Sequence, residues 1–176
     1  FRRVLFRSST AKHLGFVQCI CIRTAHEGRI INTIKNFAHV YQLKGLKVKT
    51  VHGDGQFKCC KEELSKEPYN MIVIICAKEA HVEVAERTNR LLKERIRCVK
   101  AMLPYNKYPR RLLMEIIYTI VQMINAVPRK GSFSYGRLSI REIITGKRLI
   151  IPPVPVGWYV HAISGGSSQP TYNRQK

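Results

Sequence analysis

The order of strand-like and helix-like segments constrains the fold of this chain more than any other feature of its sequence. Short apolar runs favour strands, because they are rich in β-branched residues or alternate them with lysines, and they lie at residues 15–22, 46–52 and 71–77. Segments that favour helices, most of them with apolar residues at three- and four-residue spacing, lie at residues 29–43, 57–64, 82–102, 110–127 and 138–145. Strands that alternate with helices predict a layered α/β domain.

The 176 residues are enough for one hydrophobic core, and four parts are expected along the chain. Residues 1–8 are basic and patternless, and residues 3–8 resemble the translation of a common sequencing-adaptor end. We therefore expect an artefactual or unstructured leader there. The parts that follow are an α/β domain, the start of a small β segment, and a linker or disordered tail, at residues 9–149, 150–163 and 164–176.

The charge balance predicts a polyanionic partner. Lysine and arginine number 31 against 11 acidic residues, which gives a formal net charge of +20 and a pI of about 10.1. Nucleic acid is the most common partner for such an excess of positive charge. A ribosomal-type basic protein, or a fragment that has lost an acidic part, would show the same balance.

The sequence disfavours both a zinc site and a membrane span. The six cysteines form no C-x-x-C pair, which favours reduced structural thiols in an intracellular protein over a zinc site. The most apolar stretch, residues 112–127, is shorter than the roughly 20 residues of a membrane span and is interrupted by Glu115, Gln122 and Asn125. We therefore expect no membrane partner, and a core helix whose polar face includes Asn125.

Asp54 is the only aspartate in the chain, and it follows a predicted strand between Gly53 and Gly55. A carboxylate at the end of a strand, beside an open turn, is well placed to bind a hard cation such as Mg²⁺. The alternative is a turn aspartate, since Asp-Gly is a favoured turn pair. The local pattern alone favours the turn.

Glu86 opens the predicted basic helix and shares a face with Arg90, Lys93 and Arg97, at offsets of four, seven and eleven residues. One acid followed by a row of cations fits a metal ligand with phosphate-binding groups beside it. A solvated surface helix with ordinary ion pairs would give the same pattern.

Taken in order, these two acidic segments resemble the integrase core of copia-type retrotransposons. The matching stretches are His52-Gly53-Asp54-Gly55-Gln56-Phe57 and, after the strand at residues 71–77, residues 84–95. Shorter matches lie at residues 103–104, 124–128, 138–139, 144–146 and 157–160, so the resemblance covers about residues 15–162. It implies a ribonuclease-H-like three-layer fold, with a mixed sheet flanked by helices, that is incomplete at its N-terminus.

The family carries an Asp, Asp, Glu triad, and the resemblance matches its second aspartate to Asp54 and its glutamate to Glu86. The 31 residues between these two are somewhat fewer than in the family, which a short deletion near residues 65–79 would explain. The family places its first aspartate on the strand before residues 16–22, but no aspartate precedes Asp54 in this chain. We expect a truncation, and therefore an inactive chain with an active parent.

The resemblance implies DNA integration. The reaction would be metal-dependent polynucleotidyl transfer, in the 3′-end processing and strand transfer of retroelement DNA. Asp54 and Glu86 would hold the Mg²⁺ or Mn²⁺. The side chains expected to hold phosphates are Arg90, Lys93, Arg97, Lys100, Arg110 and Arg111. Its partners would be the element's DNA ends, target DNA and further copies of the chain, in the nucleus and in cytoplasmic virus-like particles. Two alternatives are a catalytically dead nucleic-acid-binding remnant and a basic structural module that oligomerises through residues 112–127.

Overall fold

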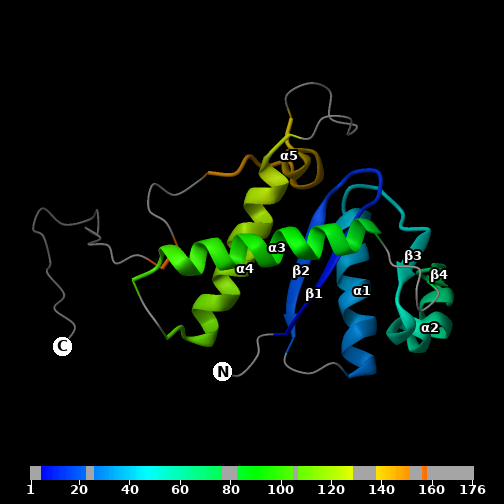
Figure 1. Ribbon diagram of the computed structural model, residues 1–176. Coiled ribbons are helices and arrows are strands. Elements are labelled where there is room, and N and C mark those ends of the chain that lie inside the picture. Colours follow the sequence, from blue (N-terminus) through cyan, green and yellow to red (C-terminus); the bar gives the residue numbers. More distant parts are fainter. Residues whose placement is uncertain are drawn as a thin grey trace, which may run out of the picture.

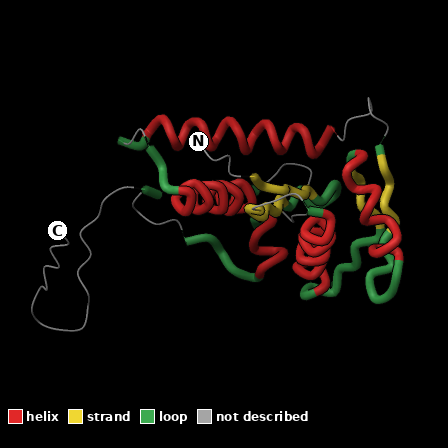
Figure 2. The backbone as a smooth tube through the Cα atoms, turned by 90° about the horizontal axis from the view of Figure 1, so that it is seen from below, coloured by secondary structure: helices red, strands yellow, loops and turns green. Residues whose placement is uncertain are grey.

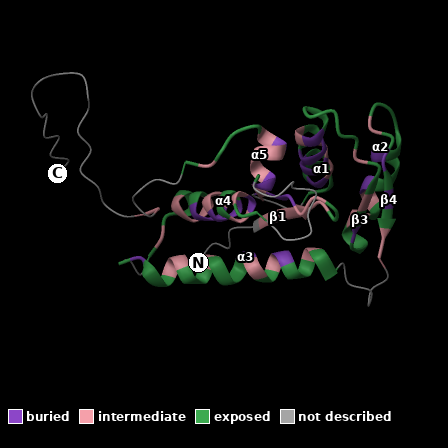
Figure 3. Ribbon diagram, turned by 90° about the horizontal axis from the view of Figure 1, so that it is seen from above, coloured by how far each residue is buried: buried purple, intermediate pink, exposed green. Residues whose placement is uncertain are grey.

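The structure is a computed structural model that describes residues 5–22, 26–76, 83–104, 107–128, 138–150 and 156–157. Within these segments the elements form three layers (Figure 1, Figure 2 and Figure 3). The helix α3 (Glu83–Met102) lies on one side of a middle layer that holds the first two strands and α4 (Arg110–Ala126). On the other side lie α1 (Glu27–Gln42) and α5 (Ile140–Thr145). The predicted α/β class is confirmed.

Four strands pair as two separate two-stranded sheets in the described part of the chain. The strand β1 (Leu5–Thr10) runs antiparallel to β2 (Val17–Ile22), and β3 (Thr50–Gly53) runs parallel to β4 (Ile72–Ile75). The strand pairing is therefore of both kinds, as expected of a mixed sheet, but the two pairs are not joined through a shared strand.

The connection from β3 to β4 consists of η1 (Gly55–Cys60), which is a 3₁₀-helix, and α2 (Lys61–Ser65). A parallel strand pair requires a crossover of about this length. The sequence analysis expected a single helix over residues 57–64. The structure starts the helical segment two residues earlier and divides it at Cys60.

The predicted leader at residues 1–8 is corrected by β1. Residues 5–8 belong to that strand, which pairs with β2 along its whole length, from Leu5 opposite Ile22 to Thr10 opposite Val17. Backbone hydrogen bonds to β2 order this segment although its own sequence lacks an apolar period. Residues 1–4 lie outside the described part of the chain.

At the other end of the chain, the predicted β segment at residues 150–163 and the tail at residues 164–176 are described only at residues 150, 156 and 157.

Three clusters of buried side chains hold the layers together. The first joins α1 to the crossover and β4 through Ile30, Ile34, Ala38, Cys60, Leu64, Met71 and Val73. The second joins β2, α3 and α4 through Val17, Leu92, Leu103, Ile116, Ile120 and Val121. The third joins the end of α1 to α5 through Phe16, Tyr41, Ile140 and Ile144. The apolar face of α4 therefore packs against the chain's own core.

Asn125 of α4 is buried, which corrects its expected place on a polar face. Its Oδ1 accepts a hydrogen bond from the backbone N–H of Val17 at 2.9 Å, and its Nδ2 donates to the Val17 carbonyl oxygen at 2.7 Å. Both residues are almost fully shielded from solvent, with exposed fractions of 4% and 0%. A buried amide that satisfies two backbone groups in this way fixes α4 against the start of β2.

Replacing this amide should destabilise the whole domain. Asn125→Ala leaves the N–H and C=O of Val17 buried without partners, at a cost of about 1–3 kcal/mol for each group. Urea unfolding followed by circular dichroism should show the loss. The control is Gln122→Ala, because Gln122 is exposed on the same helix and its replacement should change the free energy of unfolding by less than about 0.5 kcal/mol. Equal effects of the two substitutions would contradict this account.

Candidate metal and nucleic-acid site

Asp54 follows the last residue of β3 and caps η1. Its Oδ1 accepts a hydrogen bond from the backbone N–H of Gln56 at 3.0 Å, and the residue is exposed. The structure therefore gives Asp54 the helix-capping role of a turn aspartate, but that bond engages only one of its two carboxylate oxygens. The second carboxylate oxygen, Oδ2, belongs to an exposed side chain. It is therefore accessible to a metal ion from solvent.

The turn before Asp54 requires a glycine. Gly53 is buried, and a Cβ atom at this position would lie 2.6 Å from Cδ2 of Phe57. That separation is too short for two carbon atoms, so a larger residue would displace the aromatic ring or the end of β3. Packing against Phe57 thus fixes the backbone that presents Asp54.

Glu86 lies in the first turn of α3 and is exposed. The neighbouring acid, Glu83, is paired with Arg87 at 2.5 Å, one helical turn along. Carboxylates are favoured in the first turn of a helix because its N-terminus carries partial positive charge. The helix itself therefore accounts for an acid here, and a metal-binding role needs support from the surroundings of Glu86.

That support comes from β1, which contacts the elements of both acids through neighbouring residues. The guanidinium Nη2 of Arg7 donates to Oε1 of Gln56 at 2.6 Å, and its Cζ lies 5.8 Å from the centre of the Phe57 ring. Ser8 Oγ donates to Oδ1 of Asn89 at 2.5 Å. Gln56 is two residues from Asp54, and Asn89 is one helical turn from Glu86.

A second bond from β1 reinforces its contact with α3. Thr10 Oγ1 donates to Oγ1 of Thr88 at 3.0 Å. Side chains of alternate strand residues point to the same side, so Ser8 and Thr10 both face α3 while Arg7 points away toward η1. One strand thus positions the start of η1 and the start of α3.

Arg7, Ser8 and Thr10 are the positioning residues that the sequence analysis missed. The adaptor-like residues 3–8 were assigned to a leader, and only the strand-favouring triplet at residues 4–6 pointed to a strand. β1 is also the strand before residues 16–22, and Leu5–Thr10 contains no carboxylate. The resemblance puts the first aspartate on this strand, but β1 is present and holds no carboxylate, so loss of this strand does not explain the missing aspartate.

The carboxylate oxygens of Asp54 and Glu86 are of the type that binds a hard divalent cation, but two carboxylates are a small number of ligands. Mg²⁺ is commonly bound by one or two carboxylates together with water and phosphate oxygens, which Asp54 and Glu86 can supply in part. In the segments that the structure describes, no group of three or more His, Cys, Asp and Glu side chains is arranged to hold a metal ion. A pair of metal ions shared by acidic ligands needs more carboxylates than these two.

Two buried cysteines, Cys60 beside the site and Cys19 in β2, have raised pKa values. Cys59 and Cys60 end η1 with their Sγ atoms 3.6 Å apart, and all six cysteines are free. Burial, and then the contact with Cys59, raises the pKa of Cys60 to about 12. Burial likewise raises the pKa of Cys19 to about 12. Both groups are protonated at neutral pH, whereas metal ions bind the thiolate.

Most of the predicted phosphate-binding side chains are exposed. Arg90, Lys93 and Arg97 project from α3, whose buried residues are Thr88 and Leu92. Arg110 and Arg111 are exposed at the start of α4.

Lys100 differs from the other predicted phosphate-binding residues, because it is half-buried near the end of α3. Its Nζ lies 5.2 Å from the centre of the Tyr108 ring, and its carbonyl oxygen accepts a hydrogen bond from Tyr108 Oη at 2.9 Å. The structure therefore gives Lys100 a packing role within the chain.

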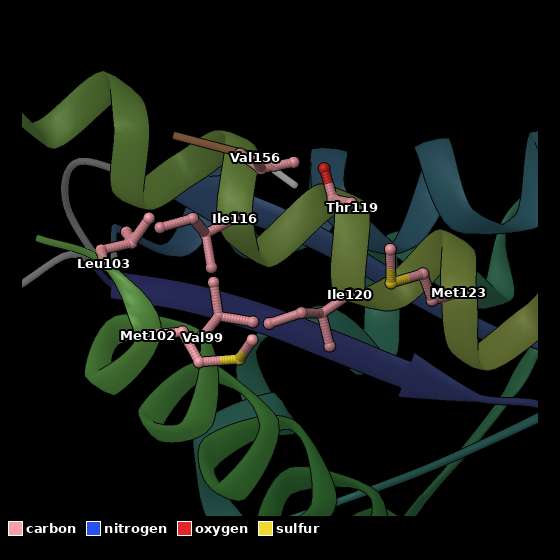
Figure 4. Close-up of a pocket in the computed structure, with 8 residues that line it drawn as sticks. All are labelled: Val99, Met102, Leu103, Ile116, Thr119, Ile120, Met123 and Val156. Atoms are coloured by element: carbon pink, nitrogen blue, oxygen red, sulfur yellow. The ribbon is translucent and has the colours of Figure 1, made fainter. Parts of the chain in front are cut away.

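The site lies on an open surface. A pocket of about 170 Å³ between α3 and α4 is lined by apolar side chains and one hydroxyl, from Val99, Met102, Leu103, Ile116, Thr119, Ile120, Met123 and Val156 (Figure 4). Such a lining suits neither phosphate nor a hard cation. Asp54 and Glu86 are both exposed and do not line this pocket.

Comparisons with known proteins address the fold. No protein-family model matches the sequence, and no curated protein matches it. The structure is similar to the crystal structure of the catalytic core domain of BIV integrase, with a TM-score of 0.56 and 16% sequence identity over 81% of this chain and 86% of that chain.

The fold is that of an integrase core. The predicted ribonuclease-H-like class is therefore confirmed. The integrase that shows it is retroviral, so the copia-type assignment stays a prediction. No helix in the described segments is long and apolar enough to cross a membrane.

Proposed function

We propose that this chain is part of an enzyme that integrates retroelement DNA by metal-dependent polynucleotidyl transfer. Asp54 and Glu86 would bind Mg²⁺ or Mn²⁺, and Arg90, Lys93 and Arg97 would hold the phosphates of the DNA. The observation that carries the proposal is that neighbouring residues of β1 hold the start of η1, beside Asp54, and the start of α3, beside Glu86. The resemblance of the sequence to copia-type integrases supports the same two residues.

The ion would supply Lewis-acid chemistry, by lowering the pKa of an attacking water or hydroxyl and by stabilising the leaving oxygen. The chain's own residues would orient it, since Asp54 is fixed by its bond to Gln56 and Gln56 by Arg7. Cations along α3 would hold the phosphodiester backbone without reading its sequence.

We further propose that full activity needs a third carboxylate, and that it lies one strand further upstream than the resemblance indicates, because β1 fills the expected place without a carboxylate. The open edge of β1 leaves room for such a strand, because β1 pairs only with β2 within the described residues. Activity would also require several copies of the chain, and we propose that the parent protein acts in virus-like particles and the nucleus.

An assay with the upstream strand restored tests this function. The 176-residue chain and the extended chain are incubated with a labelled linear duplex and Mn²⁺, and nicked and joined products are separated by size. Only the extended chain should give products, and only with the metal. Within it, Asp54→Asn and Glu86→Gln should each reduce the rate at least about a hundredfold, because each removes a charged ligand.

Glu94→Gln is the matched control, since Glu94 is an exposed acid on the same helix, and its replacement should leave the rate within about twofold. Products that form without metal, or that persist in both ligand variants, would exclude the proposed chemistry.

A DNA-binding remnant without catalysis is the second candidate, and the exposed cations of α3 combined with the small acidic set favour it. It predicts DNA binding but no products from the extended chain. The third possibility, oligomerisation through residues 112–127, is weakened because Ile116, Ile117 and Ile120 are buried inside the chain.

Both leading candidates predict that Lys93→Ala weakens DNA binding. The substitution removes one phosphate contact, so the slope of log K against log salt concentration should become shallower by about 0.9. Fluorescence anisotropy with a labelled duplex at several salt concentrations measures this slope. Lys35→Ala serves as the control, because Lys35 is paired with Glu63 at 2.9 Å. If the slope stays the same in Lys93→Ala, Lys93 does not contact phosphate.

A further inference from the structure

We propose that the chain has a second phosphate-binding surface for duplex DNA, at the end of the domain where the β1–β2 turn, the end of α1 and α5 meet. We call it the α1/α5 basic surface. Its side chains come from the β1–β2 turn, the connection between α1 and β3, and the segment after α5, and they are Lys12, Lys44, Lys47, Lys49, Lys147 and Arg148. The inference rests on the proposed DNA partner for the identity of the polymer, and it is independent of the metal site.

Packing brings these three segments together. Ala11 and Leu14 of the β1–β2 turn, Val48 of the α1–β3 connection and Ile144 of α5 all pack in the cluster around Phe16 and Tyr41. The ends of the two helices also approach each other, because Lys44 Nζ lies 3.5 Å from the position that a Cβ atom of Gly146 would occupy. In Figure 1 the β1–β2 turn, the end of α1 and α5 lie at the same upper end of the molecule.

The cations of this surface point outward. All six are exposed. Val48 is half-buried and packs inward, so its neighbours Lys47 and Lys49 face solvent on the other side of the extended chain. Because Val48 packs inward, the charged side chains of Lys47 and Lys49 both face solvent.

Acidic residues are absent from the segments that form the surface. Residues 11–14, 43–49 and 146–150 contain no Asp or Glu. The acid of α5 is Glu142, whose Oε2 accepts hydrogen bonds from the N–H and the hydroxyl of Ser139, both at 2.7 Å. These bonds, and then the charge of nearby Arg148, lower the pKa of Glu142, so among the described cations of the surface Arg148 is the one with this acidic neighbour. By contrast, α3 carries Glu83, Glu86 and Glu94 among its cations. The α1/α5 basic surface is thus the more uniformly positive of the two.

Helix ends explain only part of this cluster. Lys44 follows α1 and Lys147 follows α5, where a cation is favoured by the partial negative charge of a helix C-terminus. That effect falls off within one turn and does not account for Lys12, Lys47 or Lys49. Several like charges held close together repel one another, which a bound polyanion relieves.

The two basic surfaces belong to different parts of the fold, because α3 lies on one side of the middle layer and α1 and α5 lie on the other (Figure 3). A straight duplex that lies along α3 would not also cover the ends of α1 and α5. The chain would therefore hold two DNA segments at once, and uniform phosphate contacts would make the second contact independent of sequence.

Lysine acetylation tests this inference directly. The chain is treated with an acetylating reagent with and without duplex DNA, and each lysine is followed by mass spectrometry. Lys44, Lys47, Lys49 and Lys147 should be protected severalfold by DNA, in the same digest that reports Lys93 of α3. Lys35, which is paired with Glu63 and lies over the Tyr69 ring, is the internal control and should not change.

The outcomes separate the two surfaces. Protection of Lys93 alone would overturn the α1/α5 basic surface and leave the α3 assignment intact. Protection of the α1/α5 lysines alone would support the α1/α5 basic surface and overturn the α3 assignment. Equal protection of Lys35 would mean general shielding and would also overturn it. Protection by duplex RNA but not by duplex DNA would refute the DNA assignment.

A charge-neutralised variant gives a second test. Lys47→Gln combined with Arg148→Gln should lower the salt slope of DNA binding by up to about 1.8, because two phosphate contacts are lost. The unfolding midpoint should stay the same, since both residues are exposed. The variant should also stop bringing a donor-labelled and an acceptor-labelled duplex together in an energy-transfer assay, as should Lys93→Gln combined with Arg97→Gln. Unchanged slope and energy transfer in the first variant would contradict the proposal.

Discussion

The strand β1 is the element on which the candidate site depends. It is held to β2 along its whole length, and its side chains hold η1 on one side and α3 on the other. Arg7 bonds to Gln56, two residues from Asp54, and Ser8 bonds to Asn89, one helical turn from Glu86, so this strand relates the positions of the two acids. Without β1, each acid would have only its local role, as a cap or as a first-turn carboxylate.

The remaining interactions make that arrangement rigid. Asn125 ties α4 to Val17 of β2, and the cluster around Leu92 packs α3 against β2 and α4. The charges are then distributed over a fixed frame, with one row of cations on α3 and a second set around the ends of α1 and α5. We propose that this frame holds nucleic acid and a divalent ion together.

The sequence predicted the long helices well, because apolar spacing in α1, α3 and α4 reflects which face each helix buries. It also predicted the exposure of Arg90, Lys93 and Arg97. It failed where tertiary contacts decide the structure. β1 has no apolar period and is ordered by pairing with β2. Asn125 is polar yet buried, because Val17 offers it two backbone partners. Such partners lie far away in the chain, so no local pattern reveals them.

The shared binding of one ion by Asp54 and Glu86 can be measured directly. Mn²⁺ is titrated into the isotopically labelled chain, and paramagnetic broadening of the backbone amide signals of Gln56 and Asn89 is followed by NMR. The account predicts that both signals weaken at the same Mn²⁺ concentration, and that Asp54→Asn abolishes the effect at both. Broadening near only one acid, or broadening at Asn89 that survives Asp54→Asn, would show that the two carboxylates do not share an ion.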